Sequence, residues 1–207
     1  AAAALPARLL APRPGERVAD LCAAPGGKTA QLAAMGAAVT AVERDPKRAA
    51  RLRENLARLR QTVQVVEADA TTWTPAERFD AVLLDAPCSA TGTIRRHPDI
   101  PHRKRPRDLT GLAATQAGLL AATARLLAPG GRLVFATCSL QPEEGEAHLA
   151  TAATLGLMID PVRPEEVPGL DMAITTAGAL RTRPDLWAER GGMDGFFIAR
   201  FRAGGAP

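Results

Sequence analysis

Short apolar runs alternate with helix-like segments along most of the chain, and this alternation constrains the fold more strongly than any other feature. The strand-like runs occupy residues 17–22, 38–43, 63–67, 79–84 and 132–137. Strands that alternate with helices favour right-handed crossovers, which give a mainly parallel sheet with helices on both faces. The sequence therefore predicts an α/β fold built on such a sheet.

Capping and breaking residues mark the helices and the connections between them. Helices are expected over residues 28–35, over 45–60, and from Thr110 to a stop at Pro129-Gly130-Gly131. The segment from Asp85 to about Asp108 shows no periodicity and is too long for a plain connector. We therefore expect this loop to carry function.

The last third of the chain gives a weaker pattern. Residues 195–201 predict a clear strand and Met158-Ile159 a candidate strand, with a loop between them. Paired as a hairpin, the two strands would complete the sheet with at least one antiparallel edge. The tail at 204–207 is expected to be loose.

Length and composition limit the class of protein. The 207 residues suffice for one domain with a sizeable core, so residues 1–207 are expected to form a single domain. With 46% hydrophobic and 23% charged residues, and no uncharged apolar stretch of membrane-spanning length, the chain is typical of a soluble globular protein. It begins at Ala1 without a secretory signal, so we expect a fragment of a longer protein.

Charge, cysteine and aromatic content narrow the partners and the compartment. Lys and Arg number 26 against 22 Asp and Glu, and this net charge of +4 permits an anionic partner without requiring one. Three cysteines without a CxxC pair provide neither a disulfide framework nor a four-thiolate zinc site, which favours a reducing cytoplasm. With 5 Phe, 2 Trp and no Tyr, arginines rather than stacked rings would hold any nucleic acid.

Ligands of open parallel sheets gather at the carboxyl ends of the strands, and this chain places a glycine turn and an acid there. The first run leads into Ala23-Ala24-Pro25-Gly26-Gly27, whose backbone N–H groups open a helix, and Glu43 ends the second run. Because Glu43 can accept hydrogen bonds from two ribose hydroxyls, the pair indicates a nucleoside-containing cofactor. The turn matches neither GxGxxG nor a phosphate loop, which requires Gly where Cys22 stands.

Each of these residues also has a plainer interpretation. The turn could begin a helix that needs glycine only for packing. Glu43 and Asp69, which follow the second and third runs, are taken singly more often solvated acids than ligands. Their joint placement at one edge of the sheet favours the binding site.

Two cysteines follow adjacent strands. Cys88 and Cys138 lie just beyond the fourth and fifth runs, with Asp85 nearby, although a lone cysteine is usually a small buried hydrophobe. A shared metal is an alternative that would need further ligands from His97 or His102, but the spacing matches no metal motif. We therefore interpret the pair as reactive, whereas Cys22 in the glycine turn is expected to pack or to line the cofactor pocket.

The loop after Cys88 has the strongest local charge bias in the chain. Residues 94–107 contain six Arg or Lys and two His against one acid. A solvated surface loop is the plain alternative, but this loop leaves directly from the strand end that carries Asp85. A phosphate-rich substrate that arrives over the two cysteines fits better, with His97 ordering the loop or contacting phosphate.

Several segments together resemble the Sun family of RNA cytosine-5 methyltransferases, most closely the bacterial Fmu/RsmB type that modifies small-subunit ribosomal RNA. They are DLCAAPGGKT at 20–29, DAPCSATG at 85–92 with IRRHPD at 94–99, TCS at 137–139 with the acids 143–144, and DGFF at 194–197. The resemblance extends over about residues 1–202. It implies the Rossmann-like S-adenosylmethionine-dependent methyltransferase fold and RNA, expected to be 16S ribosomal RNA, as the substrate.

The resemblance also implies the roles of the site residues. S-adenosylmethionine would be bound by the segment comprising Cys22, Ala23, Ala24, Pro25, Gly26, Gly27 and Lys28. Glu43 would contact the ribose, Asp69 would lie near the adenine, and Asp85 would lie beside the methionine end and the target base. Cys138 would be the nucleophile and Cys88 would assist product release. Glu43 stands where the family commonly has Asp, and Ala90 replaces a frequent Gly.

The implied chemistry explains why these residue types are needed. C5 of cytosine is too poor a nucleophile to attack a methyl group, and attack of the Cys138 thiolate at C6 makes C5 enamine-like. Asp85 at N3 would stabilise the charge that builds on the ring, and removal of the C5 proton would expel Cys138 with help from Cys88. Lys28 would lower a thiol pKa or orient Asp85. The base must leave its stack, so a flipped or unpaired cytosine is expected.

Three other interpretations stay open. A catalytically idle RNA-binding or ribosome-assembly module would keep the fold and the basic loop but not the cysteines and the cofactor turn. A methyltransferase of exocyclic amines would want an aromatic residue where Cys88 stands, and DNA cytosine-5 methylation would leave Cys138 unexplained. We expect a cytoplasmic monomer without metal, lacking the N-terminal RNA-binding domain of its family, that binds cofactor alone and RNA weakly.

Overall fold

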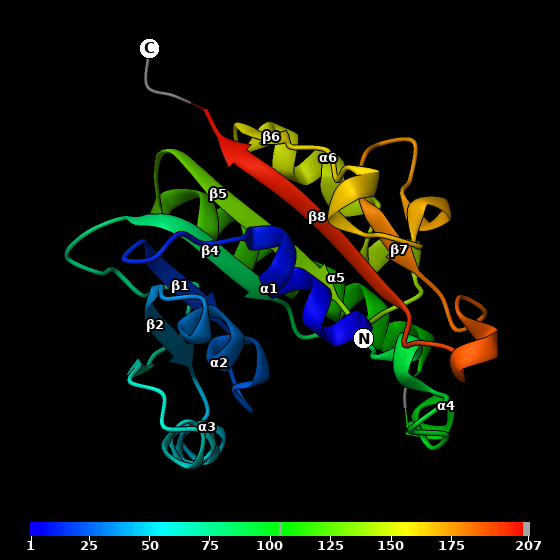
Figure 1. Cartoon of the computed structure of the whole chain (residues 1–207), viewed down its shortest axis with the longest axis horizontal. Coiled ribbons are helices and arrows are strands. Elements are labelled where there is room, and N and C mark those ends of the chain that lie inside the picture. The colour runs from blue at the N-terminus through cyan, green and yellow to red at the C-terminus, as the bar shows by residue number, and fades with distance from the viewer. Residues whose placement is uncertain (104, 205–207) are drawn as a thin grey trace.

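A computed structural model describes residues 1–103 and 105–204, in which strands and helices alternate as predicted (Figure 1). The strands are β1 (Arg17–Leu21), β2 (Ala38–Glu43), β3 (Gln64–Glu67), β4 (Phe79–Asp85), β5 (Leu127–Thr137), β6 (Leu157–Ile159), β7 (Leu180–Thr182) and β8 (Phe196–Ala203). The helices are α1 (Leu5–Leu10), α2 (Gly27–Ala34), α3 (Pro46–Arg58), α4 (Ile100–Arg103), α5 (Pro106–Leu126) and α6 (Ala147–Thr154). All five strands predicted for the first two thirds of the chain are present.

The strands form one sheet, and its order determines where a site can lie. The described residues build an eight-stranded sheet of order β3-β2-β1-β4-β5-β8-β6, with β7 pairing with β8 beside this path. Strands β1 to β5 are parallel to one another, whereas β8 runs antiparallel to β5, β6 and β7. The strand order reverses between β1 and β4, so the carboxyl ends of these strands border a crevice. The predicted parallel sheet with an antiparallel C-terminal strand is confirmed.

Helices cover both faces of the sheet, as the alternation predicts. On one face α1 and α2 bury Leu9 and Leu32 against the strands, and on the other α5 and α6 bury Leu120 and Ala152. Figure 1 shows α1 and α2 in front of the strands and α5 behind them. The side chains of each strand alternate between the two faces of the sheet. The helices on both faces therefore pack on the same strands and hold the carboxyl edge of the sheet in place.

The predicted amphipathic helix after Glu43 is α3, and its first turn is capped as expected. The Asp45 carboxylate accepts a hydrogen bond from the Arg48 backbone N–H at 2.9 Å. Leu52 and Leu56 are buried, whereas Leu59, which continues the same stripe, is exposed because the helix ends at Arg58. The cap therefore fixes the start of α3 directly beside the end of β2.

The loop between Asp85 and Asp108 is shorter than predicted. Part of it folds as α4, and α5 begins at Pro106 rather than at Thr110. The Asp108 carboxylate accepts a hydrogen bond from the Arg105 backbone N–H at 2.9 Å, and this contact caps the helix one turn earlier than the predicted Thr110 cap. The Thr110 prediction was wrong because the contact between Asp108 and Arg105 starts the helix at Pro106, which places Thr110 inside it.

The end of α5 and the C-terminal third also differ from the prediction in detail. Strand β5 begins at Leu127 and runs through Pro129-Gly130-Gly131, because Leu127 pairs with Phe79 across an irregular register. Strand β7 lies in the segment predicted as loop, while β6 and β8 pair antiparallel as predicted. Gly204 donates its backbone N–H to the carbonyl oxygen of Gly156, in the turn before β6. Residues 205–207, the rest of the predicted loose tail, lie outside the described residues.

Candidate active site

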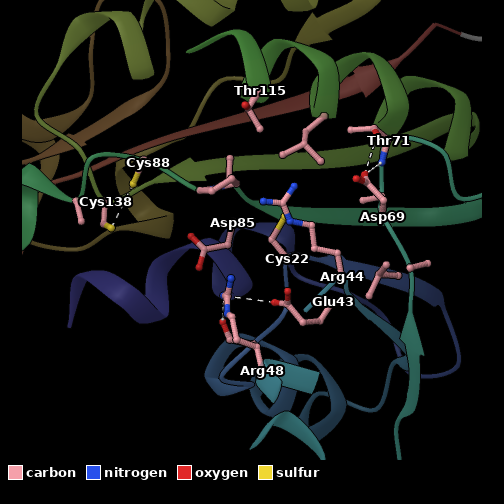
Figure 2. Close-up of a pocket in the computed structure, with 18 residues that line it drawn as sticks. Cys22, Glu43, Arg44, Arg48, Asp69, Thr71, Asp85, Cys88, Thr115 and Cys138 are labelled. Atoms are coloured by element: carbon pink, nitrogen blue, oxygen red, sulfur yellow. Dashed lines mark hydrogen bonds and ion pairs between the residues drawn. The ribbon is translucent and has the colours of Figure 1, made fainter. Parts of the chain in front are cut away.

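A cavity of about 240 Å³ lies at the carboxyl edge of the sheet, where β1, β2, β4 and β5 end (Figure 2). The residues predicted for the site that line it are Cys22, Ala24, Glu43, Asp69, Asp85, Cys88 and Cys138. The other predicted residues, Ala23, Pro25, Gly26, Gly27 and Lys28, belong to the same turn and helix start but do not line this cavity. The structure thus brings both cysteines and all three acids to one space.

The glycine turn has a backbone that few side chains permit. Gly26 has φ +103°, and a Cβ there would lie 2.6 Å from the Cδ1 atom of Leu52. Cys22 also lies in the left-handed region, with φ 61°. Arg48 donates from Nη2 to the carbonyl oxygen of Ala24 at 2.8 Å, which ties the turn to α3. The positive φ angle therefore favours glycine at position 26, where a side chain would also displace Leu52 of α3, and the turn borders the cavity through Cys22 and Ala24.

Glu43 ends β2 as a buried acid that faces the cavity. Its Oε1 accepts the backbone N–H of Asp45 at 3.1 Å. Its Oε2 lies 3.3 Å from Arg48 Nη2, but it accepts no hydrogen bond from the described residues although it is fully buried. A buried carboxylate oxygen that lacks a donor costs free energy, so Oε2 is an acceptor available to a ligand hydroxyl.

Asp69 lies beyond β3 on the same side of the cavity. Its Oδ1 accepts the backbone N–H of Thr71 at 2.9 Å and the Thr71 hydroxyl at 2.6 Å, as Figure 2 shows. These hydrogen bonds hold the pKa of Asp69 below its usual value. Asp69 is therefore an ionised and oriented acceptor at the end of the cavity opposite the cysteines.

Lys28 and Asp85 form an ion pair beside the cysteines. Lys28 Nζ donates to Asp85 Oδ2 at 2.6 Å, and the ammonium group lies 5.5 Å from the ring centre of Phe196. Burial disfavours the charged lysine, but the adjacent Asp85 carboxylate outweighs it and raises the pKa of Lys28. Both predicted roles of Lys28, the orientation of Asp85 and the lowering of a thiol pKa, stay predictions, and the contact with Asp85 is compatible with the first.

Cys88 and Cys138 point toward each other with their Sγ atoms 3.4 Å apart (Figure 2). The hydrogen bond between them, burial and the negative charge of Cys138 raise the pKa of Cys88. The same hydrogen bond lowers the pKa of Cys138, and Lys28 contributes in the same direction. Burial raises the pKa of Cys22 to about 12, so Cys22 remains a thiol. Of the three sulfurs, Cys138 is the one suited to be a thiolate.

Asp20 is a buried acid that the motif contains but that the sequence interpretation gave no role. Its Oδ2 accepts the Thr29 hydroxyl at 2.5 Å, and its Oδ1 has no hydrogen-bond donor among the described residues. Burial raises the pKa of Asp20 to about 7. The signal that could have revealed it is an acid inside an otherwise apolar strand, at a position that alternation places in the core.

The basic loop is less free than predicted. Asp194, just before β8, accepts hydrogen bonds from Arg95 Nε at 3.0 Å and from Arg96 Nη2 at 2.7 Å. Arg103 pairs with Asp99 at 3.1 Å, His97 is exposed, and Lys104 lies outside the described residues. The first two arginines therefore brace the loop against the C-terminal strand, and the sequence could not show this because their partner lies almost 100 residues away.

The other residues of the cavity were given no site role from the sequence. They are Val42, Arg44, Arg48, Ala68, Ala70, Thr71, Ala86, Pro87, Ala90, Thr115 and Leu119. Arg44 and Arg48 could have been anticipated, since Arg44 follows Glu43 directly and Arg48 lies in the first turn of the capped helix. Thr115 and Leu119 come from α5, which reaches the cavity from the far face, and no local pattern announces that contact.

Among residues 1–103 and 105–204, no three His, Cys, Asp or Glu side chains are grouped so that they could hold a metal ion. His97 and His102 accordingly do not join the two cysteines in such a group. Within the same ranges, no helix has both the length and the apolar character of a membrane span.

The sequence matches a family described as 16S rRNA methyltransferase RsmB/F over residues 7–202. The chain belongs to this family. It is 52% identical over 146 residues to the ribosomal RNA small subunit methyltransferase B of Erwinia tasmaniensis, covering 68% of this chain and 34% of that protein. It is 42% identical over 202 residues to the protein of that name from Sodalis glossinidius, covering 94% and 43%.

The structure is similar to the solved structure of NSun6 from Pyrococcus horikoshii with SFG, with a TM-score of 0.82 and 27% sequence identity. The match covers 96% of this chain and 50% of that one. Membership of the RsmB/F family and this match confirm the predicted resemblance, the methyltransferase fold and S-adenosylmethionine as the cofactor. The chain spans less than half of the curated relatives' length.

Proposed function

We propose that this RsmB/F-family chain methylates C5 of a cytosine in RNA, with 16S ribosomal RNA as the substrate, through a covalent bond between Cys138 and C6. The observation that carries the proposal is the pair of sulfurs 3.4 Å apart beside the Lys28–Asp85 ion pair, at one end of the cavity. A single nucleophilic thiol would not need a second one at contact distance. Two thiols suit a reaction in which one sulfur attacks and the other assists its departure.

The residues of the cavity fit S-adenosylmethionine on observations of their own. Glu43 Oε2 is a buried acceptor without a donor, which suits a ribose hydroxyl, and Asp69 at the far end suits the adenine amine. Cys22 and Ala24 line the cavity between these acids and Asp85. When bound, the cofactor supplies an electrophilic methyl group.

Cys138 would begin the reaction as the thiolate. Its sulfur forms a bond to C6 of the cytosine, and the electrons of the C5–C6 double bond move toward C5 and N3. The proton that Lys28 shares with Asp85 would pass through the Asp85 carboxylate to N3 and stabilise the charge on the ring, and N3 would return it when the C5–C6 double bond reforms. C5 thereby becomes nucleophilic enough to take the methyl group.

Cys88 would serve in the second half of the reaction, when the C5 proton must leave and the bond from Cys138 to C6 must break. The largest cause that raises the pKa of Cys88 is its hydrogen bond to Cys138, and the negative charge there adds to it. Once Cys138 is bonded to carbon, that anion is gone and Cys88 ionises more readily. Cys88 can then take the C5 proton, directly or through a water, while the C6–sulfur electrons return to Cys138.

The substrate and the surroundings are part of the same proposal. The chain spans only a third to under a half of its curated relatives, so the expected RNA-binding domain would add most of the affinity for RNA. The catalytic domain formed by residues 1–207 would act as a monomer in the cytoplasm, bind S-adenosylmethionine by itself and bind RNA weakly. Arginines of the loop that are not paired with Asp194 would contact the phosphates.

The test compares Cys88→Ala with Cys138→Ala, each incubated with S-adenosylmethionine and unmodified 16S ribosomal RNA. We expect Cys88→Ala to accumulate an RNA adduct that survives denaturant, because attack still occurs while release fails. Cys138→Ala should give neither adduct nor methylated RNA. The unchanged chain serves as the control and should methylate the RNA without accumulating the adduct.

Two outcomes would contradict the proposal. An adduct with Cys138→Ala alone would exchange the roles of the sulfurs and favour a mechanism in which Cys88 attacks. Equal modification of a single-stranded DNA of the same sequence, in parallel samples of the unchanged chain, would remove RNA as the specific substrate.

A further inference from the structure

Glu144 is a fully buried acid that takes no part in the reaction described above. It lies in a short turn, Pro142–Glu144, seven residues after the end of β5. Its carboxylate accepts the backbone N–H of Ser89 at 2.9 Å, the Ser89 hydroxyl at 2.5 Å and the amide Nε2 of Gln116 at 3.1 Å. Because its neighbours are donors, these contacts suit an ionised carboxylate.

The contacts of Glu144 connect the two segments that carry the cysteines. Ser89 follows Cys88 directly, so the carboxylate holds the backbone beside that sulfur. The carbonyl oxygen of Glu144 accepts the Thr137 hydroxyl at 2.8 Å, next to Cys138. One residue is thus bonded to the neighbours of both cysteines.

Helices α5 and α6 stabilise this connection through Gln116 and His148. Gln116 of α5 also donates from Nε2 to the carbonyl oxygen of Pro87 at 2.9 Å, so both amide hydrogens are used. Its Oε1 is therefore an acceptor, and His148 of α6 lies 2.8 Å from it through Nε2. The amide orientation fixes that histidine nitrogen as the donor, and the network leaves the Glu144 carboxylate little freedom to move.

We propose that Glu144 is a positioning residue: its backbone lies in the segment that follows Cys138, its buried carboxylate binds the segment that follows Cys88, and this connection determines which sulfur acts as the nucleophile. The inference rests on the proposed function only for the roles of the two thiols. The connection itself follows from hydrogen bonds that span 28 and 55 residues of sequence. Family membership does not assign this role.

The charge of Glu144 differs in its effect on the two sulfurs. After the hydrogen bond to Cys138, burial and the Cys138 charge, the Glu144 charge is a further cause that raises the pKa of Cys88. Cys138 instead faces Asp85, which opposes its ionisation, and Lys28, which favours it. His148 has its pKa lowered by burial and adds no positive charge to this network at neutral pH. The Glu144 charge therefore adds to the causes that keep Cys88 a thiol, and it is not among the causes that act on Cys138.

The first experiment removes the charge and keeps the shape. Glu144→Gln can still accept from the Ser89 backbone, and its amide can donate to the Ser89 hydroxyl. We expect the pH profile of Cys88 alkylation by iodoacetamide, followed by mass spectrometry, to shift to lower pH. Glu143→Gln is the matched control, since Glu143 is the exposed neighbour and its profile should equal that of the unchanged chain.

The second experiment removes the connection. Phenylarsine oxide bridges two neighbouring thiols and releases water, so its affinity reports the distance between the sulfurs. We expect Glu144→Ala to bind it about tenfold or more weakly than the unchanged chain, because the two thiols no longer act together. Glu143→Ala should retain full affinity.

These measurements use neither RNA nor cofactor, so they separate this inference from the proposed function. A folded Glu144→Gln with an unchanged Cys88 profile, or a folded Glu144→Ala that binds phenylarsine oxide normally, would overturn the inference even if RNA is methylated. Should neither variant fold, Gln116→Ala removes one donor and the bond to Pro87. Weaker phenylarsine oxide binding by that variant supports the connection, and unchanged binding overturns it.

Discussion

Buried acids are treated in opposite ways in the two halves of the site. In the cofactor half, formed by the ends of β1 to β3, Asp20 Oδ1 and Glu43 Oε2 accept no hydrogen bond from the described residues. In the cysteine half, formed by the ends of β4 and β5, both oxygens of Glu144 accept hydrogen bonds. Of the two acids in the first half, Glu43 lines the cavity and can offer its acceptor to a ligand, whereas the second half uses the acceptors of Glu144 internally.

The difference corresponds to what each half has to do. A buried acceptor without a donor costs free energy until a ligand provides the donor, so such groups favour binding. A buried acceptor with all its donors is rigid, and rigidity is needed where two sulfurs must stay 3.4 Å apart. Substitutions in the cysteine half should therefore lower the free energy of unfolding. Substitutions of the buried acids in the cofactor half should instead raise the free energy of unfolding or weaken ligand binding.

The largest effect is expected where the cysteine half has no room. Gly92 packs on Gly195, and a Cβ at position 92 would lie 1.9 Å from the Gly195 carbonyl oxygen. Because that neighbour is backbone, Gly92→Ala should lower the free energy of unfolding by more than about 4 kcal/mol. Urea denaturation measures the change.

The matched control for Gly92→Ala is Gly118→Ala in α5, where a Cβ would meet nothing within 4 Å. Alanine is the better helix former, so this variant should gain up to about 1 kcal/mol. If both variants lost the same stability, steric crowding at position 92 would not be the cause.

A smaller effect of the opposite sign is expected for Asp20 in the cofactor half. The unfolded carboxyl releases its proton near pH 3.8 and the folded one near pH 7, so stability is full below pH 3.8 and falls until about pH 7. Asp20→Asn cannot ionise and should lack this fall, which makes it more stable above pH 7 by about 2 to 4 kcal/mol.

Thermal melts of both chains from pH 4 to pH 8 test the Asp20 prediction. The two curves should start close together at pH 4 and diverge as the pH rises. Parallel curves across the range would mean that the Asp20 carboxyl ionises equally in the folded and unfolded chains.

The smallest effect is expected for the acceptor held in reserve at the end of β2. Glu43→Gln keeps one acceptor but loses the charge, and should weaken S-adenosylmethionine about tenfold in calorimetry without loss of stability. Glu67→Gln is the control, because Glu67 is the register partner of Glu43 on β3 but pairs with Arg53 outside the cavity. Equal weakening by both variants would point to general electrostatics rather than to a ribose contact.

The cofactor half could be predicted from the sequence because each residue acts where its own strand ends. The run that ends at Glu43 and the glycine turn after β1 are local patterns, and the parallel sheet places them side by side without further information. The cysteines were found for the same reason. Even there, Asp20 was given no role, since its position inside a strand does not show that its partner is the Thr29 hydroxyl.

The rest depends on contacts between distant segments. The bonds of Glu144 to Ser89 and of Asp194 to Arg95 span 55 and 99 residues, and no periodicity encodes them. The start of α5 was misplaced because the contact that starts the helix lies before Thr110. Short elements such as α1 and β7 form through tertiary pairing, which overrides weak local preference.

The position of β8 has a consequence for how the chain is made. Strands β6 and β7 pair only with β8 in the described sheet, and β8 also covers the edge of β5. During synthesis, residues 196–203 emerge after all their partners, so β5 presents an open hydrogen-bonding edge until they arrive. A ribosome that stalls before these codons would leave a nascent chain with a complete cofactor turn, two unpaired strands and a strong tendency to aggregate.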